Sequence, residues 1–428
     1  MLPFQPTPAY AMELDANDPL AGYRQQFHLP TGDDGTPCLY LCGNSLGLQP
    51  KTVRAYVEQE LQNWERLGVE GHFKAKAPWL SYHQTLTAQT ARLVGALPLE
   101  VVVMNALTVN LHLLLVSFYR PTPDRYKVLI EADAFASDRY AVASHLRWHG
   151  YDPHDALIAM QPRAGEAMVR TADIRALLAR EGHHIALVWL GGVNYYTGQA
   201  FDMAEITRAG QAQGCVVGFD LAHAVGNLIL KLHAWGADFA VWCSYKYPNA
   251  GPGGAAGCFV HERHAYRSDR PRLAGWWGHN QATRFLMPPV FDPIPGAEGW
   301  QVSNPPILQL AALRASMDLF DEVGMERLRA KSELLTGYLT YLLDHHAPAN
   351  VTMITPRDPQ QRGAQLSLRL HRHGPALHER LVQAHVICDW REPDVIRVAP
   401  VPWYNTFMDI YRFVDIFVQA NNEVQQVG

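Results

Sequence analysis

Short apolar segments alternate with longer segments of mixed polarity through the middle of this 428-residue chain. The short segments are continuously apolar, which is typical of buried parallel strands whose two faces are both covered. The segments between them have the length and polarity of helices that cross from one strand to the next. The pattern therefore predicts an α/β fold with a mostly parallel central sheet flanked by helices. We expect strands at residues 101–104, 127–130, 185–190, 216–219 and 239–242, and helices at residues 52–67, 79–93, 137–149 and 171–180.

A stretch rich in proline and glycine, residues 288–306, separates this region from the last third of the chain. A helical pattern follows, and strand and helix patterns then alternate again, so we expect a smaller C-terminal α/β domain joined to the large one by a long helix. The expected elements are a helical connection at 307–343, strands at 365–370 and 395–398, and a helix at 376–384. The predicted boundaries are 1–50 for an N-terminal arm that forms part of the small domain, 51–306 for the large domain, and 307–428 for the connecting helix and small domain.

The composition excludes several classes of partner. Hydrophobic residues make up 48% of the chain, enough to fill the cores of domains of this size. The net charge of -5 shows no basic bias, so we expect neither nucleic acid nor an anionic membrane as a partner. The longest apolar runs are too short to span a bilayer, and the first residues lack the basic and apolar regions of a signal peptide.

The cysteines and histidines bear on the compartment and on metal binding. The six cysteines are scattered without a Cys-x-x-Cys pair, and several lie within apolar strands. This usage suits free thiols in a reducing cytoplasm better than a disulfide framework, so we expect a cytoplasmic protein. The twenty histidines are not grouped at the spacing of metal ligands, and we expect adjacent pairs such as His183-His184 to point their side chains apart and not at one ion. We therefore expect no metal site.

Two charged residues follow successive predicted strands, at the edge where open α/β sheets bind ligands. Lys246 follows the strand at 239–242 and precedes a glycine-rich loop, and Asp220 follows the strand at 216–219. Pyridoxal phosphate (PLP) needs both groups, because its aldehyde forms a Schiff base with a lysine and its pyridinium nitrogen pairs with a carboxylate. The carboxylate keeps that nitrogen protonated, which lets the ring withdraw electrons from a breaking bond. Alone, the lysine could be a solvated loop charge and the aspartate a helix cap, but their joint placement favours a PLP enzyme.

The glycine-rich loop itself, Gly-Pro-Gly-Gly at residues 251–254, offers a different interpretation as a nucleotide phosphate loop. Such a loop ends in Gly-Lys followed by Ser or Thr, which contact the nucleotide phosphates and magnesium. The residues that follow here are Ala-Ala-Gly. The phosphate-loop interpretation is therefore not favoured.

Five sequence blocks, in order along the chain, make it similar to a known family. They are residues 41–47 (LCGNSLG), 104–112 (MNALTVNLH), 220–224 (DLAHA), 245–246 (YK) and 398–405 (VAPVPWYN). On these blocks, which extend over nearly the whole chain, it resembles the kynureninase family, PLP-dependent hydrolases of the aspartate aminotransferase superfamily with fold type I. The resemblance implies hydrolytic cleavage of the Cβ–Cγ bond of L-kynurenine or 3-hydroxy-L-kynurenine. The products would be L-alanine and anthranilate or 3-hydroxyanthranilate, in tryptophan catabolism and NAD biosynthesis.

The resemblance assigns the chemistry to residues near the predicted strand ends. Lys246 is similar to the family's Schiff-base lysine, which also acts as the base at the substrate α-carbon. Tyr245 resembles a tyrosine that contacts the cofactor phosphate and takes part in proton transfer. Asp220 would hold the pyridine nitrogen, with His223 beside it. In the implied mechanism Lys246 removes the α-proton, water adds to the γ-carbonyl, and the Cβ–Cγ bond then breaks.

The resemblance also implies a stacking residue and a phosphate site. Phe135 would stack on the cofactor ring. Ser137 and Asp138 lie at the start of a predicted helix, and a helix N-terminus is a favourable seat for a phosphate. Leu107 and Thr108 would complete this seat.

Other positions imply a partner subunit and a substrate pocket. Trp276 and Asn304 match residues that reach the phosphate from the second subunit, so we expect an obligate homodimer with the site at its interface. Arg397 resembles an arginine that binds the substrate α-carboxylate, which a guanidinium can do with two parallel hydrogen bonds. His72, Ser303 and Asn304 resemble a pocket associated with a preference for 3-hydroxykynurenine. On sequence alone, Arg397 could instead face solvent from its strand, and His72 could be an ordinary loop residue.

Two positions depart from the family pattern. Ala136 stands where many members have proline, which affects the stiffness of the loop and not its chemistry. Gly191 stands where some members place a small hydroxyl residue that touches the cofactor. Losing one hydrogen bond there would cost about 0.5–1.5 kcal/mol. Neither departure changes the assignment.

Rival functions on the same fold remain open at this point. A cysteine desulfurase or an aminotransferase would share the Asp220 and Lys246 pair. A desulfurase also needs a reactive cysteine on a mobile loop, whereas Cys258 and Cys388 lie in segments with an ordered, apolar pattern. A non-catalytic PLP-binding homologue would lack a catalytic group, and none of the expected groups is missing here.

Overall fold

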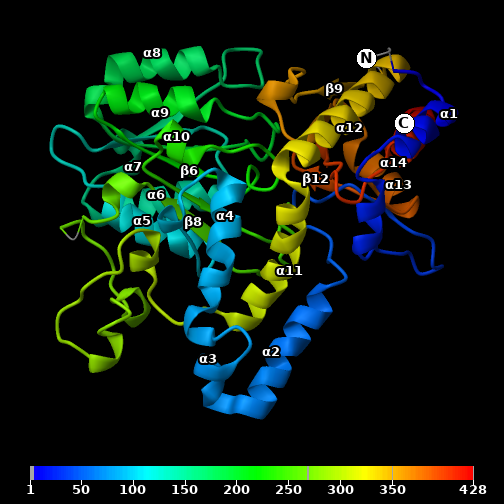
Figure 1. Ribbon diagram of the computed structural model, residues 1–428. Coiled ribbons are helices and arrows are strands. Elements are labelled where there is room, and N and C mark those ends of the chain that lie inside the picture. Colours follow the sequence, from blue (N-terminus) through cyan, green and yellow to red (C-terminus); the bar gives the residue numbers. More distant parts are fainter. Residues whose placement is uncertain (1–3, 268, 349, 428) are drawn as a thin grey trace.

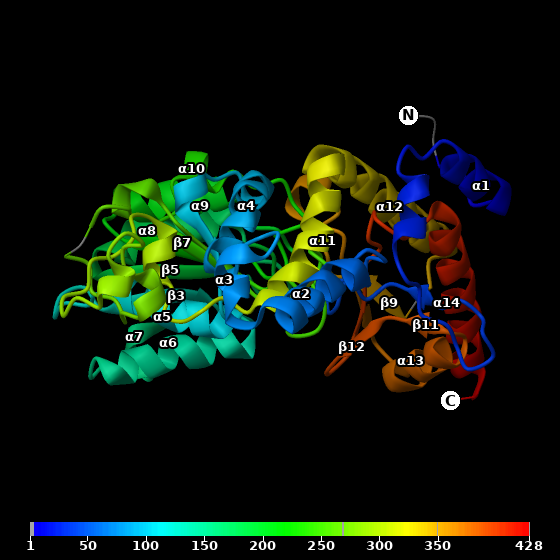
Figure 2. The ribbon, with the colours of Figure 1, turned by 60° about the horizontal axis from the view of Figure 1, so that its bottom comes forward.

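The computed structural model describes residues 4–267, 269–348 and 350–427. Residues 1–3 lie outside the described residues. They begin the N-terminal segment in which the sequence analysis expects no signal peptide. Figures 1 and 2 show two lobes, a larger one built around a central sheet and a smaller one that holds both ends of the chain. Within the described ranges, no helix combines the length and the apolar character needed to cross a membrane.

The larger lobe contains a sheet whose strands, over the described residues, have the order β2-β8-β7-β6-β5-β3-β4. All pairings among β3, β4, β5, β6 and β7 are parallel, whereas β8 is antiparallel to both β2 and β7. The prediction of a mostly parallel central sheet is therefore confirmed. The strands are β2 (Val101–Val103), β3 (Lys127–Glu131), β4 (Leu157–Met160), β5 (Ile185–Gly191), β6 (Val216–Asp220), β7 (Phe239–Trp242) and β8 (Gly257–Val260).

Helices cover both faces of this sheet (Figure 2). On one face lie α8, α9 and α10, and on the other lie α5, α6 and α7, each packing buried side chains against the strands. The helices of this lobe, with the protruding α2–α3 region that precedes it, are α2 (Val53–Leu67), α3 (Gly71–Lys74), α4 (Thr87–Val94), α5 (Leu107–Phe118), α6 (Ala136–Trp148), α7 (Pro153–Ala156), α8 (Thr171–Glu181), α9 (Met203–Ala212) and α10 (Leu232–Trp235).

One predicted helix, at residues 79–93, differs in the structure. Its first half is a 3-10 helix, Trp79–Leu86, and only its second half is the α-helix α4. The tighter first half is fixed from outside: Trp79 Nε1 donates to Glu60 at 2.9 Å, and His83 Nε2 lies 3.3 Å from Glu298. These tertiary contacts outweigh the local preference for a continuous α-helix.

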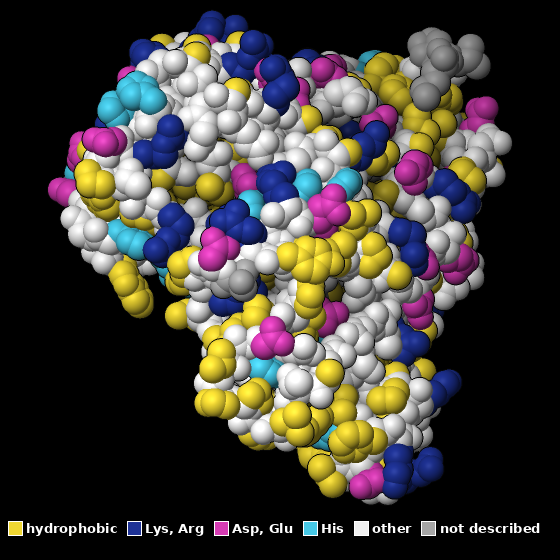
Figure 3. Space-filling view, turned by 60° about the vertical axis from the view of Figure 1, so that its left-hand side comes forward, with side chains coloured by type: hydrophobic (Ala, Val, Ile, Leu, Met, Phe, Trp, Pro, Cys, Tyr) yellow, Lys and Arg dark blue, Asp and Glu magenta, His cyan; other side chains and the backbone are white. Residues whose placement is uncertain are grey.

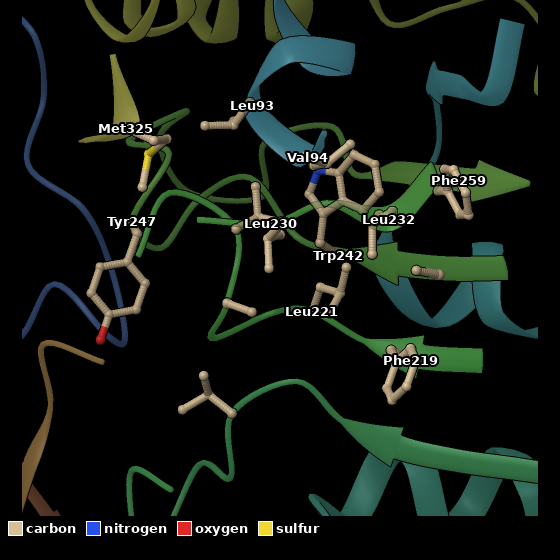
Figure 4. Close-up of a cluster of buried hydrophobic side chains, with 14 of the residues drawn as sticks. Leu93, Val94, Phe219, Leu221, Leu230, Leu232, Trp242, Tyr247, Phe259 and Met325 are labelled. Atoms are coloured by element: carbon tan, nitrogen blue, oxygen red, sulfur yellow. The ribbon is translucent and has the colours of Figure 1, made fainter. Parts of the chain in front are cut away.

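A cluster of buried side chains holds the ends of the central strands in place (Figure 4). Phe219, Trp242 and Phe259 come from the adjacent strands β6, β7 and β8, and they pack in the same core as Leu93 and Val94 of α4. Each fully buried large side chain contributes about 1.5–3 kcal/mol. Of the two residues that the sequence predicts for the cofactor, Asp220 ends β6 and Lys246 follows β7, so this packing fixes the strand ends from which both are placed.

The smaller lobe contains an antiparallel sheet whose strands, in the described part of the chain, have the order β12-β13-β10-β9. The N-terminal segment joins this lobe, because β1 pairs with β11 and α1 packs on α14 (Figure 1). The long helices α11 and α12 connect the two lobes. These elements are α1 (Pro8–Ala16), β1 (Leu39–Tyr40), α11 (Ile307–Val323), α12 (Met325–His346), β9 (Val351–Met353), β10 (Leu366–Leu370), α13 (Gly374–Gln383), β11 (Val386–Ile387), β12 (Asp389–Arg391), β13 (Val395–Val398) and α14 (Phe407–Val427).

Candidate active site

A cavity lies at the carboxyl ends of β3, β5, β6 and β7, where α5 and α6 also begin. This is the edge at which ligands bind to open parallel sheets. The residues that the sequence predicts for the cofactor and that line this cavity are Leu107, Thr108, Phe135, Ser137, Asp138, Asp220, His223, Tyr245 and Lys246. The cavity is also lined by Glu131, Gly191, Val193, Tyr195 and Ala222.

Lys246 and His223 form a close polar contact in this cavity, with 2.9 Å between Lys246 Nζ and His223 Nε2. Burial lowers the pKa of His223 well below its ordinary value, and the charge of Lys246 adds to this effect, so the imidazole is neutral near pH 7. The amine then donates to Nε2, which leaves the proton of the ring on Nδ1. His223 Nδ1 is buried and has no hydrogen-bond partner among the described residues. It is therefore a donor available to a polar atom of a ligand.

Asp220 and Asp138 form a buried pair of carboxyl groups. Burial raises the pKa of Asp220, although a hydrogen bond from Ala222 N–H (2.7 Å) and the charge of Lys246 oppose that effect. Burial and then the charge of Asp220 raise the pKa of Asp138 well above its ordinary value, so Asp138 is the member that holds a proton. Asp138 Oδ1 has no partner in the described part of the chain. A cationic group that binds here would therefore lie beside the buried carboxylate of Asp220, and its charge would favour release of the proton from Asp138.

The starts of α5 and α6 form a site suited to an anion. Thr108 Oγ1 of α5 lies 2.8 Å from Ser137 Oγ of α6. Within the described residues no side chain caps the first turn of either helix, so backbone N–H groups there are free to donate. Leu107 is the first residue of α5 and lines the same space. Asp138, which the sequence grouped with this phosphate seat, directs its carboxyl group toward Asp220 instead.

Two aromatic side chains line the cavity next to this anion site. Phe135 is 47% exposed, and its ring lies edge-on to the ring of Tyr195, with 5.3 Å between their centroids. The backbone carbonyl of Tyr195 accepts a hydrogen bond from Arg397 Nη1 at 2.6 Å. Tyr195 thus links the cavity to the predicted carboxylate-binding arginine, which does not itself line the cavity.

Arg397 in β13 lies directly across the sheet from Asp389 in β12 and is 1% exposed. Its Nη2 forms an ion pair with the Asp389 carboxylate and lies 3.3 Å from Ser45 Oγ. Burial would raise the pKa of Asp389, but Arg397 and Ser45 hold it below its ordinary value. Arg397 Nε is buried without a partner among the residues described. The solvent-facing alternative for Arg397 is therefore wrong, and one of its donors is free for an anion.

Glu131 is a buried residue of this cavity that the sequence analysis did not select. Its Oε1 accepts from Gly191 N–H at 2.9 Å, and its Oε2 accepts from Asn194 Nδ2 at 2.7 Å. These bonds hold the loop that carries Tyr195. A Cβ atom on residue 191 would lie 2.7 Å from Glu131 Oε1, so the glycine at this position leaves room for the carboxyl group. Glu131 ends β3 just as Asp220 ends β6, and this shared placement is the signal that could have identified it.

The other predicted site residues lie outside this cavity of their own subunit: His72, Trp276, Ser303 and Asn304. His72, in α3, lies edge-on to Trp79, with 5.3 Å between ring centroids. Trp276 Nε1 donates to a backbone carbonyl eight residues later, at 3.1 Å. Ser303 and Asn304 are exposed. A single chain therefore does not bring these residues to the cavity.

A larger groove, of about 1090 Å³, lies between α8, α9 and α12. Over the described residues its lining includes Trp235, Arg329 and Glu333 but neither a lysine nor a histidine. It therefore offers no amine to an aldehyde cofactor, and the smaller cavity remains the candidate site.

Sequence comparison relates the chain to proteins of one name. The family described as "Kynureninase C-terminal domain" matches residues 328–417. A kynureninase from Koribacter versatilis (strain Ellin345) is 61% identical over 419 residues, which cover 98% of this chain and 99% of that protein. A kynureninase from Myxococcus xanthus (strain DK1622) is also 61% identical, over 96% of each chain.

Structural comparison relates the fold to PLP enzymes of fold type I. A variant of the enzyme C-DES with glycine covalently linked to its PLP cofactor superposes with a TM-score of 0.77 at 18% identity, covering 92% of this chain and 98% of that one. The cysteine desulfurase CsdA from Escherichia coli gives a TM-score of 0.75 at 16% identity, covering 95% and 98%. At these identities the likeness shows the fold alone, and it confirms the fold class expected from the sequence.

Proposed function

The chain belongs to the kynureninase family, and from this premise we propose which of its residues carry out the reaction. It is a PLP-dependent hydrolase that acts on carbon–carbon bonds, and its activity is that of a kynureninase. The reaction is hydrolytic cleavage of the Cβ–Cγ bond of L-kynurenine or 3-hydroxy-L-kynurenine, which releases L-alanine and the aromatic amine. The predictions of family, activity and cofactor are thus confirmed. The observation that carries the proposed roles is the convergence of Lys246, His223 and Asp220 in one cavity.

The cavity fits the three reactive groups of PLP. Lys246 offers a primary amine to the aldehyde, and the buried carboxylate of Asp220 offers a counter-charge to a protonated pyridine nitrogen. The uncapped starts of α5 and α6, with Thr108 and Ser137, offer N–H and O–H donors to the phosphate. His223 adds its free Nδ1–H. When bound in this cavity, PLP withdraws electrons from the substrate α-carbon.

We propose that Lys246 removes the proton from the substrate α-carbon. A lysine that acts as a base must be a neutral amine, and the contact with neutral His223 orients Nζ without adding a second charge. Burial raises the pKa of Tyr245, with Cys243 as a second cause, so the Tyr245 phenol keeps its proton at neutral pH. Tyr245 is therefore suited to donate, either to a phosphate oxygen or to carbon.

We propose that Arg397 binds the α-carboxylate of the substrate. Its guanidinium is oriented before the substrate arrives, by the Tyr195 carbonyl on Nη1 and by Asp389 and Ser45 on Nη2. Its free Nε, together with a shared Nη, can form the paired hydrogen bonds that carboxylates prefer. Asp389 already neutralises part of the charge of Arg397. An anion therefore binds favourably only where it accepts hydrogen bonds from the free Nε and the shared Nη.

We infer an obligate homodimer in which Trp276 and Asn304 of each subunit reach the phosphate of the other. Neither residue lines its own cavity, which supports this arrangement. Hydrophobic side chains also gather on the lower part of the face in Figure 3, over the protruding α2–α3 region, and large exposed apolar patches mark interfaces. The large exposed hydrophobic residues of the α2–α3 region and of the loop after Arg284 are Leu61, Trp64, Val69, Phe73, Phe285, Leu286, Met287 and Val290.

Subunit mixing tests the shared site. One subunit carries Lys246→Ala, the other carries Trp276→Ala and Asn304→Ala, and differently tagged copies allow the mixed dimer to be purified. If the sites are shared, one site of the mixed dimer is complete and restores about half of the wild-type activity per dimer. Activity no higher than that of the parent variants, in a chain that light scattering shows to be a dimer, would contradict the proposal.

We propose that His72, Ser303 and Asn304 set the preference between the two substrates, since their polar groups can bind the 3-hydroxyl. Losing one such hydrogen bond costs about 0.5–1.5 kcal/mol, which is about 2- to 13-fold. Asn304→Ala should therefore lower the kcat/KM for 3-hydroxykynurenine by that factor relative to the kcat/KM for kynurenine. An equal loss for both substrates would remove Asn304 from this role.

We also propose the domain boundaries 1–50, 51–306 and 307–428, supported by the pairing of N-terminal β1 with β11 of the smaller lobe. We propose a cytoplasmic location, because all six cysteines, which lie within the described ranges, are free thiols, and free thiols are typical of a reducing compartment.

A desulfurase activity finds no support in the cysteines. Cys258 and Cys388 are buried, and burial raises the pKa of both thiols. A nucleophilic cysteine needs the opposite, a lowered pKa and exposure to substrate.

A further inference from the structure

Three potential metal ligands converge at the edge of the central sheet opposite the active site: Glu100, His233 and His261. His261 follows β8, and the last residue of β8 pairs with Phe239, the first residue of β7. Glu100 immediately precedes β2, and His233 lies in α10. Lys246 lies beyond the other end of β7, so this cluster is separate from the catalytic cavity.

The distances in this cluster match those between ligands of one small cation. Glu100 Oε1 lies 3.0 Å from His233 Nδ1 and 3.7 Å from His261 Nδ1. One ligand atom from each residue lies within 4.8 Å of the others, and the two imidazole rings stack with 5.1 Å between centroids. Ligand atoms about 2.0–2.1 Å from a tetrahedral metal are about 3.4 Å apart. The observed separations lie on either side of that value.

The surroundings hold the carboxylate in place and leave a way in. Glu100 is fully buried, its Oε1 accepts from Glu262 N–H and its Oε2 accepts from Leu97 N–H, both at 2.8 Å. Such outer bonds orient the carboxylate ligands of metals. In the described part of the chain, its salt-bridge partners are the two histidines alone, so this buried charge has no permanent cation beside it. The His233 side chain is 36% exposed and gives access from solvent.

We propose that Glu100, His233 and His261 bind a divalent transition-metal cation of the zinc type, with solvent completing its coordination. Two imidazole nitrogens and one carboxylate oxygen are donors that suit Zn²⁺, Co²⁺ and Ni²⁺. The metal replaces the hydrogen bond that Arg263 N–H donates to His261 Nδ1 at 3.2 Å. It ties α10 and the end of β8 to the segment before β2, and it takes no part in the reaction at Lys246. The sequence did not reveal this site because its ligands are far apart along the chain.

The test uses the PLP-loaded protein, stripped of metals with a chelator that leaves the cofactor in place. Zn²⁺ is titrated by calorimetry, Co²⁺ binding is followed by its visible absorption, and Tm is measured with and without Zn²⁺. We expect one equivalent per chain that binds more tightly than any other, with a higher Tm. His233→Ala should weaken that equivalent by at least about tenfold. The matched control His346→Ala, which removes an exposed histidine of the adjacent pair His345-His346, should not change it.

Several results would overturn the proposal. They are the absence of a tight equivalent in the wild type, a tight equivalent that persists in both His233→Ala and His261→Ala, or one that is lost in His346→Ala. Since His261 is partly buried, His233→Gln serves as the second variant if His261→Ala does not fold. It removes the nitrogen ligand at a partly exposed position, so a tight equivalent that persists in His233→Gln would also overturn the proposal.

Discussion

Replacing Arg397 with lysine keeps the positive charge but removes the planar fork that we assign to the substrate carboxylate. In the structure Nη1 is held by the Tyr195 carbonyl at 2.6 Å, Nη2 pairs with Asp389, and the buried Nε is free. A lysine presents one nitrogen at the end of a flexible chain. It can keep the ion pair with Asp389 or reach the substrate carboxylate, but it cannot form two parallel bonds with that carboxylate.

The expected magnitude follows from the number of bonds lost. A hydrogen bond to a charged group contributes about 1.5–3 kcal/mol. Losing one of the two bonds to the substrate should therefore lower kcat/KM by about 10- to 150-fold. The matched control is Arg369→Lys in the neighbouring strand β10, whose side chain is 37% exposed and pairs with Asp394 at 3.4 Å. We expect that change to alter kcat/KM by less than about twofold.

The assay measures kcat/KM for L-kynurenine and the inhibition constant of kynuramine, which lacks the α-carboxylate. Arg397→Lys should weaken turnover of kynurenine and leave the binding of kynuramine nearly unchanged. Circular dichroism and the visible absorption of bound PLP establish that the variant is folded and loaded. The reasoning is refuted if kcat/KM falls by less than about twofold, or if kynuramine binding weakens by the same factor as kynurenine turnover.

Three further predictions concern the cofactor, the loop and the pH dependence. Lys246→Ala should abolish turnover and the absorption band of lysine-linked PLP while Tm stays near that of the wild type; near-normal activity would contradict its role. Glu131→Gln should lower the free energy of unfolding by about 1–3 kcal/mol, because one donor faces another where Asn194 now bonds to the carboxylate; an unchanged urea midpoint would show that the loop adapts. Burial would raise the pKa of Asp238, but the hydrogen bond from His264 and the charge of Arg263 outweigh that effect and lower this pKa to about 2. Because this is below the ordinary 3.8, the stabilisation of about 2 kcal/mol is present above pH 4 and is lost as pH falls toward 2. Asp238→Asn should therefore be less stable than the wild type at pH 7 by about that amount and nearly equal to it near pH 2 in urea unfolding; a difference that does not depend on pH would contradict this.

Much of the larger lobe was predictable because its strands are buried on both faces. The runs at 185–190 and 216–219 are continuously apolar, and the structure extends each by one residue, to Gly191 and Asp220. The edge strand β4, half-buried along its length, was not predicted, although Leu157–Met160 form a continuously apolar run like those of the predicted strands. The placement of Asp220 and Lys246 at strand ends followed directly from where the apolar runs stop.

The parts of the site that were missed depend on contacts between distant segments. Asp389 holds Arg397 because β12 and β13 pair in one register, and no local pattern specifies that register. Asp138 was assigned to an anion from its place at a helix start, but its side chain points into the buried space beside Asp220. The positions expected to act across subunits, such as Asn304, cannot be placed by the fold of one chain.

The central claim is tested most directly by turnover of the purified, PLP-loaded protein with L-kynurenine, and separately with 3-hydroxykynurenine. Release of the aromatic amine is followed by fluorescence, and L-alanine is measured in the same sample. We predict that anthranilate or 3-hydroxyanthranilate and alanine form in equal amounts, and that neither forms with Lys246→Ala. A protein that binds PLP through Lys246 yet releases neither product from either substrate would contradict the account.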